Sequence, residues 1–179
     1  MRLKSIATFL IAFYLLVFPK MSAATTLRET CDLPQNLQDK IATEYPGARL
    51  LSLSDLDERD KKLFESDHSE SCPGLAHVDF YGDGKSTLAL VLISKLEAKE
   101  KALLVVAREV GGNWSITLLD TADDSEPVVW VQDAGEYRDV YGKKKIRATR
   151  PVIVFCGYDS WAVLYAWTGK AVAKIWLAD

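Results

Sequence analysis

From Leu75 to its end, the chain alternates between short apolar segments and glycine-containing connections. Segments such as "STLALVLIS", "KALLVVAREV" and "NWSITLLD" are rich in aliphatic and β-branched residues, and Gly111-Gly112 separates the last two. Connections of two to five residues join antiparallel strands, because parallel strands need a long crossover. This part of the chain therefore predicts consecutive β-hairpins. Residues 87–93 are apolar at almost every position, which predicts a central strand that is covered on both faces.

Before these strands, the apolar residues follow helical spacing. They fall four apart at Leu33, Leu37, Ile41 and Tyr45. This spacing predicts an amphipathic helix over residues 34–45. A second short helix is expected in "DLDERDKKLFES", where acidic residues lead and lysines follow, because that order suits the helix dipole. Helices followed by strands predict an α+β fold, with the helices packed on one antiparallel meander sheet of about six to eight strands.

The first 24 residues have the pattern of a secretory signal peptide. Arg2 and Lys4 precede an apolar run over residues 6–18, and small residues follow at Ser22-Ala23-Ala24. The run is shorter than the roughly 20 residues that a membrane-spanning helix needs. We expect cleavage after Ala24, no stable membrane insertion afterwards, and a single domain over residues 25–179 that is periplasmic or secreted.

All three cysteines follow the predicted cleavage site, where oxidation is allowed. Cys156 ends the apolar run "PVIVFC" and is expected in a buried strand, whereas Cys31 and Cys72 lie near prolines in polar sequence. We therefore predict a Cys31–Cys72 disulfide that pins the amino-terminal helix to the sheet. Closing a loop of about 41 residues would contribute on the order of 4 kcal/mol.

The net charge argues against an anionic polymer as partner. Without residues 1–24 the chain keeps 19 basic and 25 acidic side chains, a net charge of −6. The basic residues cluster only at Lys143-Lys144-Lys145, Arg147 and Arg150. Because such a run is usually a solvated turn, we do not expect nucleic acid to bind.

The segment "DFYGDGK" at residues 79–85 has two interpretations. Gly82 and Gly84 can adopt positive φ and Asp83 can bond to nearby backbone, so these residues make a tight hairpin turn without any ion. Asp79 and Asp83 are also weak candidates to bind calcium. Counted as an EF-hand-like loop, the segment places carboxylates only at positions 1 and 5.

The longer stretch "VDFYGDGKSTLALVL" resembles the strand-turn-strand signature of FG-GAP and VCBS-type repeats, which occur in secreted and adhesive proteins. The matching positions are Asp79, Gly82, Asp83, Gly84 and Lys85. Tyr81 and Thr87 stand where the family usually has further oxygen ligands. The resemblance implies a calcium-binding hairpin, and the single copy implies no propeller. The overall layout also resembles small exported bacterial proteins, which implies a location and no activity.

Catalysis by histidine has few candidates, because the chain contains only His68 and His77. His77 shares a strand face with Asp79 and would act as a general base toward Cys72 or a nearby serine. His68 lies in a polar, loop-like stretch. No GxSxG or HExxH motif surrounds either histidine, so a hydrolase that uses His77 is an alternative and not the leading interpretation.

The five tryptophans all follow residue 113. Most are expected in the core or in strand pairs, whereas Trp161 and Trp167, six residues apart on one strand face, are candidate binding aromatics. Together these features predict a non-enzymatic exported protein that binds a protein or an envelope component, for example an inhibitor, an immunity protein or an envelope accessory protein. A weak calcium-binding module is the other alternative.

Overall fold

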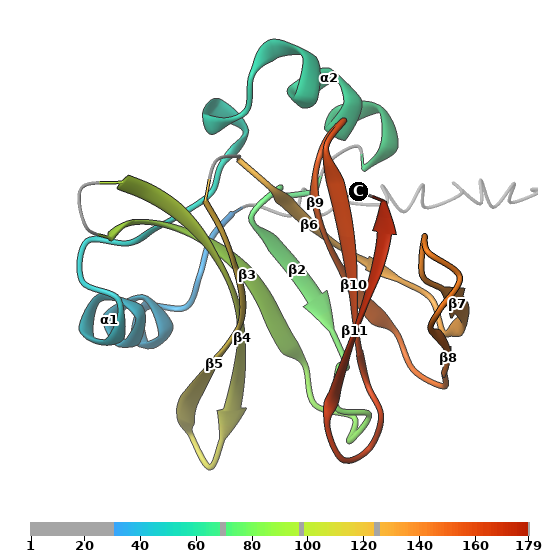
Figure 1. The fold of residues 1–179 in the computed structure, drawn as a ribbon. Helices are drawn as coiled ribbons and strands as arrows, with labels where there is room; N and C mark the ends of the chain where they lie inside the picture. The colour runs from blue at the N-terminus through green and yellow to red at the C-terminus, as the bar shows by residue number, and fades with distance from the viewer. Residues whose placement is uncertain (1–30, 69–70, 97–98, 124–125, 179) are drawn as a thin grey trace, which may run out of the picture.

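The computed structural model describes residues 31–68, 71–96, 99–123 and 126–178, and these form an α+β fold with antiparallel sheets (Figure 1). The predicted signal peptide, residues 1–24, lies outside the described residues. Within the described part, neither helix has the length and apolar content that crossing a membrane requires.

Five strands form a first sheet, which we call sheet A. They are β1 (Arg49–Leu50), β2 (Leu75–Val78), β3 (Thr87–Leu96), β4 (Lys99–Val110) and β5 (Asn113–Ala122). The strand β3 is central, because β4 pairs with one of its edges while β1 and β2 pair with different parts of the other. β5 pairs with β4 and is an edge strand.

The remaining strands form a second sheet and a separate hairpin. Sheet B has the order β11-β10-β9-β6, and a two-stranded hairpin holds β7 and β8. Their bounds are β6 (Val128–Gln132), β7 (Gly135–Arg138), β8 (Lys145–Ala148), β9 (Val152–Gly157), β10 (Trp161–Trp167) and β11 (Val172–Ala178). This differs from the single meander sheet expected above. The physical reason is that β6 pairs with β9 and not with its predecessor β5, so the chain begins a new sheet there.

The two sheets face each other across the largest part of the core. Alternate residues of β3, including Ala89 and Val91, point into this space together with Phe155 and Tyr165 of sheet B. The intervening residue Leu90 points to the opposite face, where it packs with residues of the helix α1. The prediction that residues 87–93 form a central strand buried on both faces is therefore confirmed.

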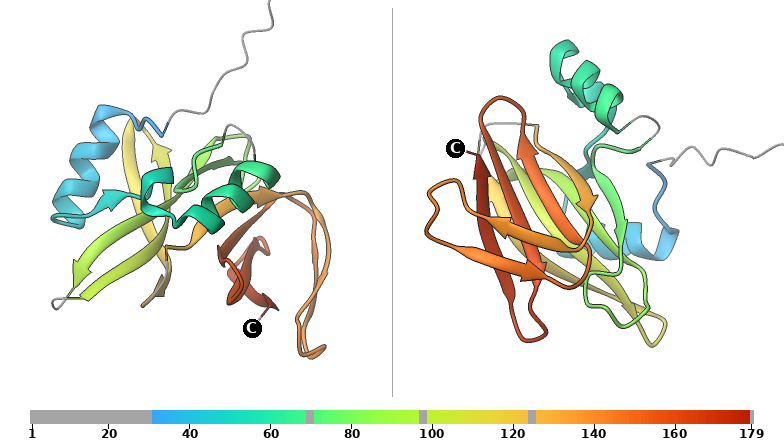
Figure 2. Two further views of the ribbon diagram at one scale, coloured as in Figure 1. Left: turned by 90° about the horizontal axis from the view of Figure 1, so that it is seen from above. Right: turned by 90° about the vertical axis from the view of Figure 1, so that its right-hand side faces the viewer.

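Both predicted helices are present. α1 (Gln35–Glu44) covers the outer face of sheet A through Leu37 and Ile41. After a short 3-10 turn, η1 (Leu53–Asp55), α2 (Glu58–Asp67) lies across one end of the space between the sheets (Figure 2) and buries Phe64 there. α2 begins at Glu58 because the carboxylate of Asp57 caps it, accepting hydrogen bonds from two amides of its first turn.

The predicted disulfide between Cys31 and Cys72 is present, with the two Cα atoms 5.3 Å apart. Cys72 is almost fully buried just before β2, so the bond joins the segment leading into α1 to sheet A. Cys156 is the free cysteine; it is half-buried in β9, and burial raises the pKa of its thiol to about 11.

Candidate functional site

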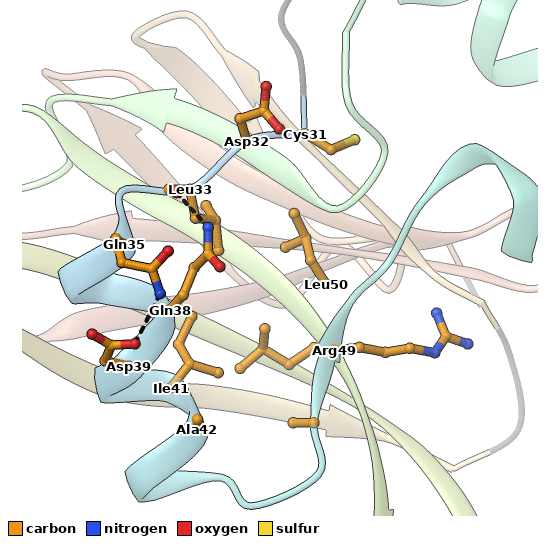
Figure 3. Close-up of a pocket in the computed structure, with 12 residues that line it drawn as sticks. Cys31, Asp32, Leu33, Gln35, Gln38, Asp39, Ile41, Ala42, Arg49 and Leu50 are labelled. Carbon is orange, nitrogen blue, oxygen red and sulfur yellow. Dashed lines mark hydrogen bonds between the residues drawn. The ribbon is translucent and has the colours of Figure 1, made fainter.

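A groove of about 450 Å³ lies between α1 and β1 on the outer face of sheet A (Figure 3). Its apolar lining comes from Leu33, Ile41, Leu50 and Leu92. Leu92 is fully buried and Ile41 almost so, which makes the floor of the groove part of the hydrophobic core beneath α1. Pockets of this volume, with an apolar floor and a few polar groups around it, are typical of ligand-binding sites.

The rim of the groove is polar and fixed by short-range hydrogen bonds. Gln38 donates from Nε2 to the carbonyl oxygen of Leu33 at 2.7 Å, and Gln35 donates from Nε2 to Oδ1 of Asp39 at 3.0 Å (Figure 3). Asp32 adds a second carboxylate beside Cys31 and is exposed. The rim formed by the segment before α1 and its first turns therefore carries two negative charges.

Arg49 lines the groove but does not neutralise these charges. Figure 3 shows its guanidinium turned away from α1, and Nη1 lies 2.7 Å from Oδ2 of Asp55. Partial burial acts to raise the pKa of Asp55, but its hydrogen bonds from Arg49 and Ser52 outweigh burial and hold that pKa below the usual value. The positive charge of Arg49 is thus balanced by Asp55. It therefore does not cancel the negative electrostatic potential of the two rim carboxylates.

Sequence patterns did not identify this groove. The helical spacing predicted which side chains of α1 face the sheet, and the cysteine pairing predicted where the chain is anchored. The groove depends on the separation between α1 and β1, which no local pattern encodes. The one available signal was the pair Asp32 and Asp39, which flank the predicted start of the helix.

The glycine turn after β2 joins β2 to β3, as the hairpin interpretation predicts, and Asp83 accepts from the nearby amide of Lys85 at 3.4 Å. Asp79 accepts hydrogen bonds from the backbone amides of Asp83 and Gly84, each at 3.1 Å, and Asp83 pairs with Arg108. Gly82 and Gly84 both have positive φ. Calcium binding by Asp79 and Asp83 remains a prediction. Such binding would require the hydrogen bonds and the ion pair of these two carboxylates to rearrange. In the ranges that the structure describes, no three His, Cys, Asp or Glu side chains group around a common point.

The basic cluster is not wholly a solvated turn. Arg150 is half-buried, packs over Gly82 and donates from Nη1 to the carbonyl oxygen of Tyr81 at 2.5 Å. Lys145 belongs to β8, where its ammonium lies 2.6 Å from Glu136. The sequence interpretation missed both roles. Arg150 is far along the chain from the turn that it supports, and the strand that holds Lys145 is short and polar.

Both histidines line a second, smaller cleft of about 210 Å³, together with Ser71 and Trp130. His68 follows the last residue of α2, in agreement with the loop-like stretch expected there, but its ring is half-buried between Phe64, at 5.1 Å, and Trp130, at 4.9 Å. His77 is exposed on β2. The partners considered for it are engaged elsewhere: Cys72 is in the disulfide, and Asp79 bonds to the turn amides.

Trp161 and Trp167 share one face of β10, as their spacing predicts, and this face points toward the core between the sheets. Trp161 meets Phe155 edge to face at 5.0 Å, and Trp167 meets Tyr81 at 5.2 Å. Both are half-buried. Their contacts favour a structural role over an exterior aromatic surface.

Among the described residues, the groove beside α1 is therefore the candidate site with the most to recommend it, because it combines an apolar floor with two rim carboxylates, and the one cation of its lining, Arg49, is paired with Asp55. Comparisons with family models, with curated proteins and with solved structures find no match to this chain. The functional argument consequently depends on geometry and chemistry alone.

Proposed function

We propose that this chain is an exported, non-enzymatic binding protein, such as an inhibitor, an immunity protein or an envelope accessory protein. Its α1 groove would receive an apolar side chain of a partner protein that is flanked by lysine or arginine. The observation that carries the proposal is the apolar groove with its two rim carboxylates, Asp32 and Asp39. The Cys31–Cys72 disulfide supports the exported location, because such bonds persist in oxidising compartments.

The chemistry of the groove defines the partner. Burying one leucine-sized side chain against the partly exposed Leu33 and Leu50 would contribute about 1.5–3 kcal/mol. The carboxylates of Asp32 and Asp39 would favour a neighbouring cation and would steer its approach. Because both carboxylates are exposed, salt would weaken this part of the attraction.

A partner-capture experiment with matched variants tests the proposal. Ala42 is exposed and lines the groove, so Ala42→Trp fills it without disturbing the core. Thr43 is exposed on the same helix outside the groove lining, so Thr43→Trp is the control of equal bulk. We expect one envelope protein of the native host to bind the wild type and Thr43→Trp but not Ala42→Trp. Retention of that protein by Ala42→Trp, or its equal loss from both variants, contradicts the proposal.

A calcium-binding module of the FG-GAP type is the second candidate. It is supported by the placement of Asp79 and Asp83 in one glycine turn, where the Asp79 carboxylate accepts from the amide of Gly84 and the Asp83 carboxylate lies 3.4 Å from the amide of Lys85. Calcium that binds only the folded protein must raise its melting temperature relative to a chelator. The increase should vanish in Asp79→Asn, whereas an equal increase in that variant would place the ion elsewhere.

The hydrolase that uses His77 is the remaining alternative, supported by the common cleft of Ser71 and His77. Its activity would have to disappear in both His77→Ala and Ser71→Ala. Survival of activity in either variant would exclude this assignment.

A further inference from the structure

The outer edge of β5 has the features of a strand edge that can pair with another β-strand. Within the described residues, β5 has β4 as its one ladder partner, so its other edge presents unpaired backbone N–H and C=O groups. Residues 113–118, "NWSITL", contain no charged residue and no proline, the usual devices that protect such an edge. Figures 1 and 2 show the tip of the β4–β5 hairpin standing apart from the β10–β11 hairpin, so the edge is accessible there.

An apolar stripe follows the outer face of this strand. Its members are Trp114, Ile116 and Leu118, opposite Glu109, Ala107 and Val105 of β4. Trp114 and Ile116 pack partly against the core beneath α1, whereas Leu118 is 48% exposed. The stripe therefore extends to the edge of the sheet with one large apolar side chain uncovered.

We propose that β5 pairs antiparallel with β5 of a second copy of this chain, around a two-fold axis that passes beside Ile116. A two-fold axis perpendicular to the sheet keeps the outer faces of both copies on the same side. In the register centred on Ile116, that residue lies opposite Ile116 of the second copy, and Leu118 lies opposite Trp114 of the second copy. The exposed leucine is thereby covered by an aromatic ring, a favourable cross-strand pair.

The same stretch explains why the occupant is a second copy. The stripe is self-complementary in this register, and no like charges meet across the axis, although the chain as a whole is acidic. The ladder is limited to about five residues on each strand, because the register of β5 shifts after Leu118. An interface this short is small beside standard protein interfaces, so the dimer should be weak and should form in a concentration-dependent manner.

Cysteine cross-linking tests the register in the full chain. In a Cys156→Ala background, Ile116→Cys places two thiols directly opposite each other across the axis. Thr117→Cys is the matched control, because residue 117 lies on the opposite face of the strand. Its two copies are not directly opposite each other but offset along the strands. Their Cα atoms are therefore farther apart than the roughly 7 Å that a disulfide tolerates. We expect a disulfide-linked dimer of the first variant and none of the second, with both variants folded under reducing conditions.

Sedimentation over a range of concentrations provides the second measurement, without any introduced thiol. The wild-type mass should rise toward that of a dimer, whereas Leu118→Lys, a change at an exposed position, should stay monomeric and keep the wild-type melting temperature. Either of two results overturns the proposal: a wild-type protein that remains monomeric at its highest soluble concentration, or cross-linking of Thr117→Cys as readily as Ile116→Cys.

Discussion

His68 connects α2 to sheet B through its ring, and this makes the stability of the protein dependent on pH. Burial between Phe64 and Trp130 lowers the pKa of His68 below its ordinary value of 6.5, against a smaller opposing effect of Asp67. The unfolded chain therefore takes up the proton more readily than the folded one. The contribution of neutral His68 is present above about pH 6.5 and is lost as the pH falls toward the folded-state pKa.

Urea unfolding between about pH 7.5 and pH 5 measures this effect. The free energy of unfolding should fall on acidification in the wild type and fall less in His68→Phe, which keeps the aromatic contact but cannot titrate. His77→Gln removes the other imidazole and should behave as the wild type. If the free energy of unfolding of His68→Phe falls with pH as steeply as that of the wild type, then His68 is not the responsible group.

The two glycines of the "DFYGDGK" turn differ in what surrounds them, although both have positive φ. A Cβ at Gly84 meets no atom within 4 Å, so Gly84→Ala should cost only the conformational strain, about 1 kcal/mol. A Cβ at Gly82 would lie 2.0 Å from Nε of Arg150 and would displace that side chain from the Tyr81 carbonyl. Gly82→Ala should therefore cost about 1 kcal/mol more, the typical contribution of one hydrogen bond. Equal costs in thermal unfolding would show that Arg150 moves away freely.

At the scale of elements, the disulfide is the anchor of α1. The helix buries only Leu37 and Ile41, so much of its attachment depends on the covalent link from Cys31 to Cys72. Replacing both cysteines by alanine should lower the free energy of unfolding by up to about 4 kcal/mol on the chain-entropy estimate. Chemical unfolding measures the loss, with Cys156→Ala as the control for removal of a thiol outside the bond. Indistinguishable curves for the double variant and the wild type would contradict this anchoring role.

Elements defined by local spacing could be predicted, and their partners in space could not. The four-residue spacing from Leu33 to Tyr45 predicted α1 within about a residue, and the glycine connections predicted the hairpins β2–β3, β4–β5 and β10–β11. The division into two sheets was missed, because β6 and β9 meet across an inserted hairpin. That hairpin was missed as well, since β7 and β8 are four residues each and polar.

The same distinction applies to the candidate site. The tight glycine turn at residues 79–85 is local and followed from the sequence, as did the pairing of Cys31 with Cys72, although Asp79 and not Asp83 accepts the two shorter backbone hydrogen bonds there. The groove beside α1, the stacking of His68 on Trp130 and the contact of Arg150 with the turn each join residues from distant parts of the chain. A single sequence contains no periodic signal for such contacts.

At the scale of the whole molecule, the two sheets are joined differently along their two sides. On one side, β6 lies beside β2, and the amide of Val129 donates to the carbonyl oxygen of Pro73 at 2.9 Å. On the other side, Asp120 of β5 reaches across to Tyr165 of β10 and Lys174 of β11. The second connection consists of side chains alone, so it can be removed without changing either sheet.

Asp120→Asn should therefore weaken the contact between the sheets. Partial burial acts to raise the pKa of Asp120, but the hydrogen bonds from Lys174 and Tyr165 outweigh it, and the net pKa is lowered below 3.8. Loss of the charged acceptor should cost about 1–3 kcal/mol at neutral pH. Most of this loss of stability is expected to come from the hydrogen bond between Tyr165 and Asp120. The ion pair with Lys174 contributes less, because Lys174 is 39% exposed and solvent screens its charge.

The pH dependence separates this contribution from simple loss of packing. A carboxyl whose pKa is lowered by folding stabilises the protein above its ordinary pKa, and the stabilisation disappears as the pH falls through the folded-state value. The wild type should therefore lose its advantage over Asp120→Asn in urea unfolding as the pH is lowered below about 4. Tyr165→Phe, which keeps the ring and the ion pair, should reproduce most of the loss at neutral pH. If Asp120→Asn is as stable as the wild type at neutral pH, then the packing between the two sheets holds them together without this side-chain connection.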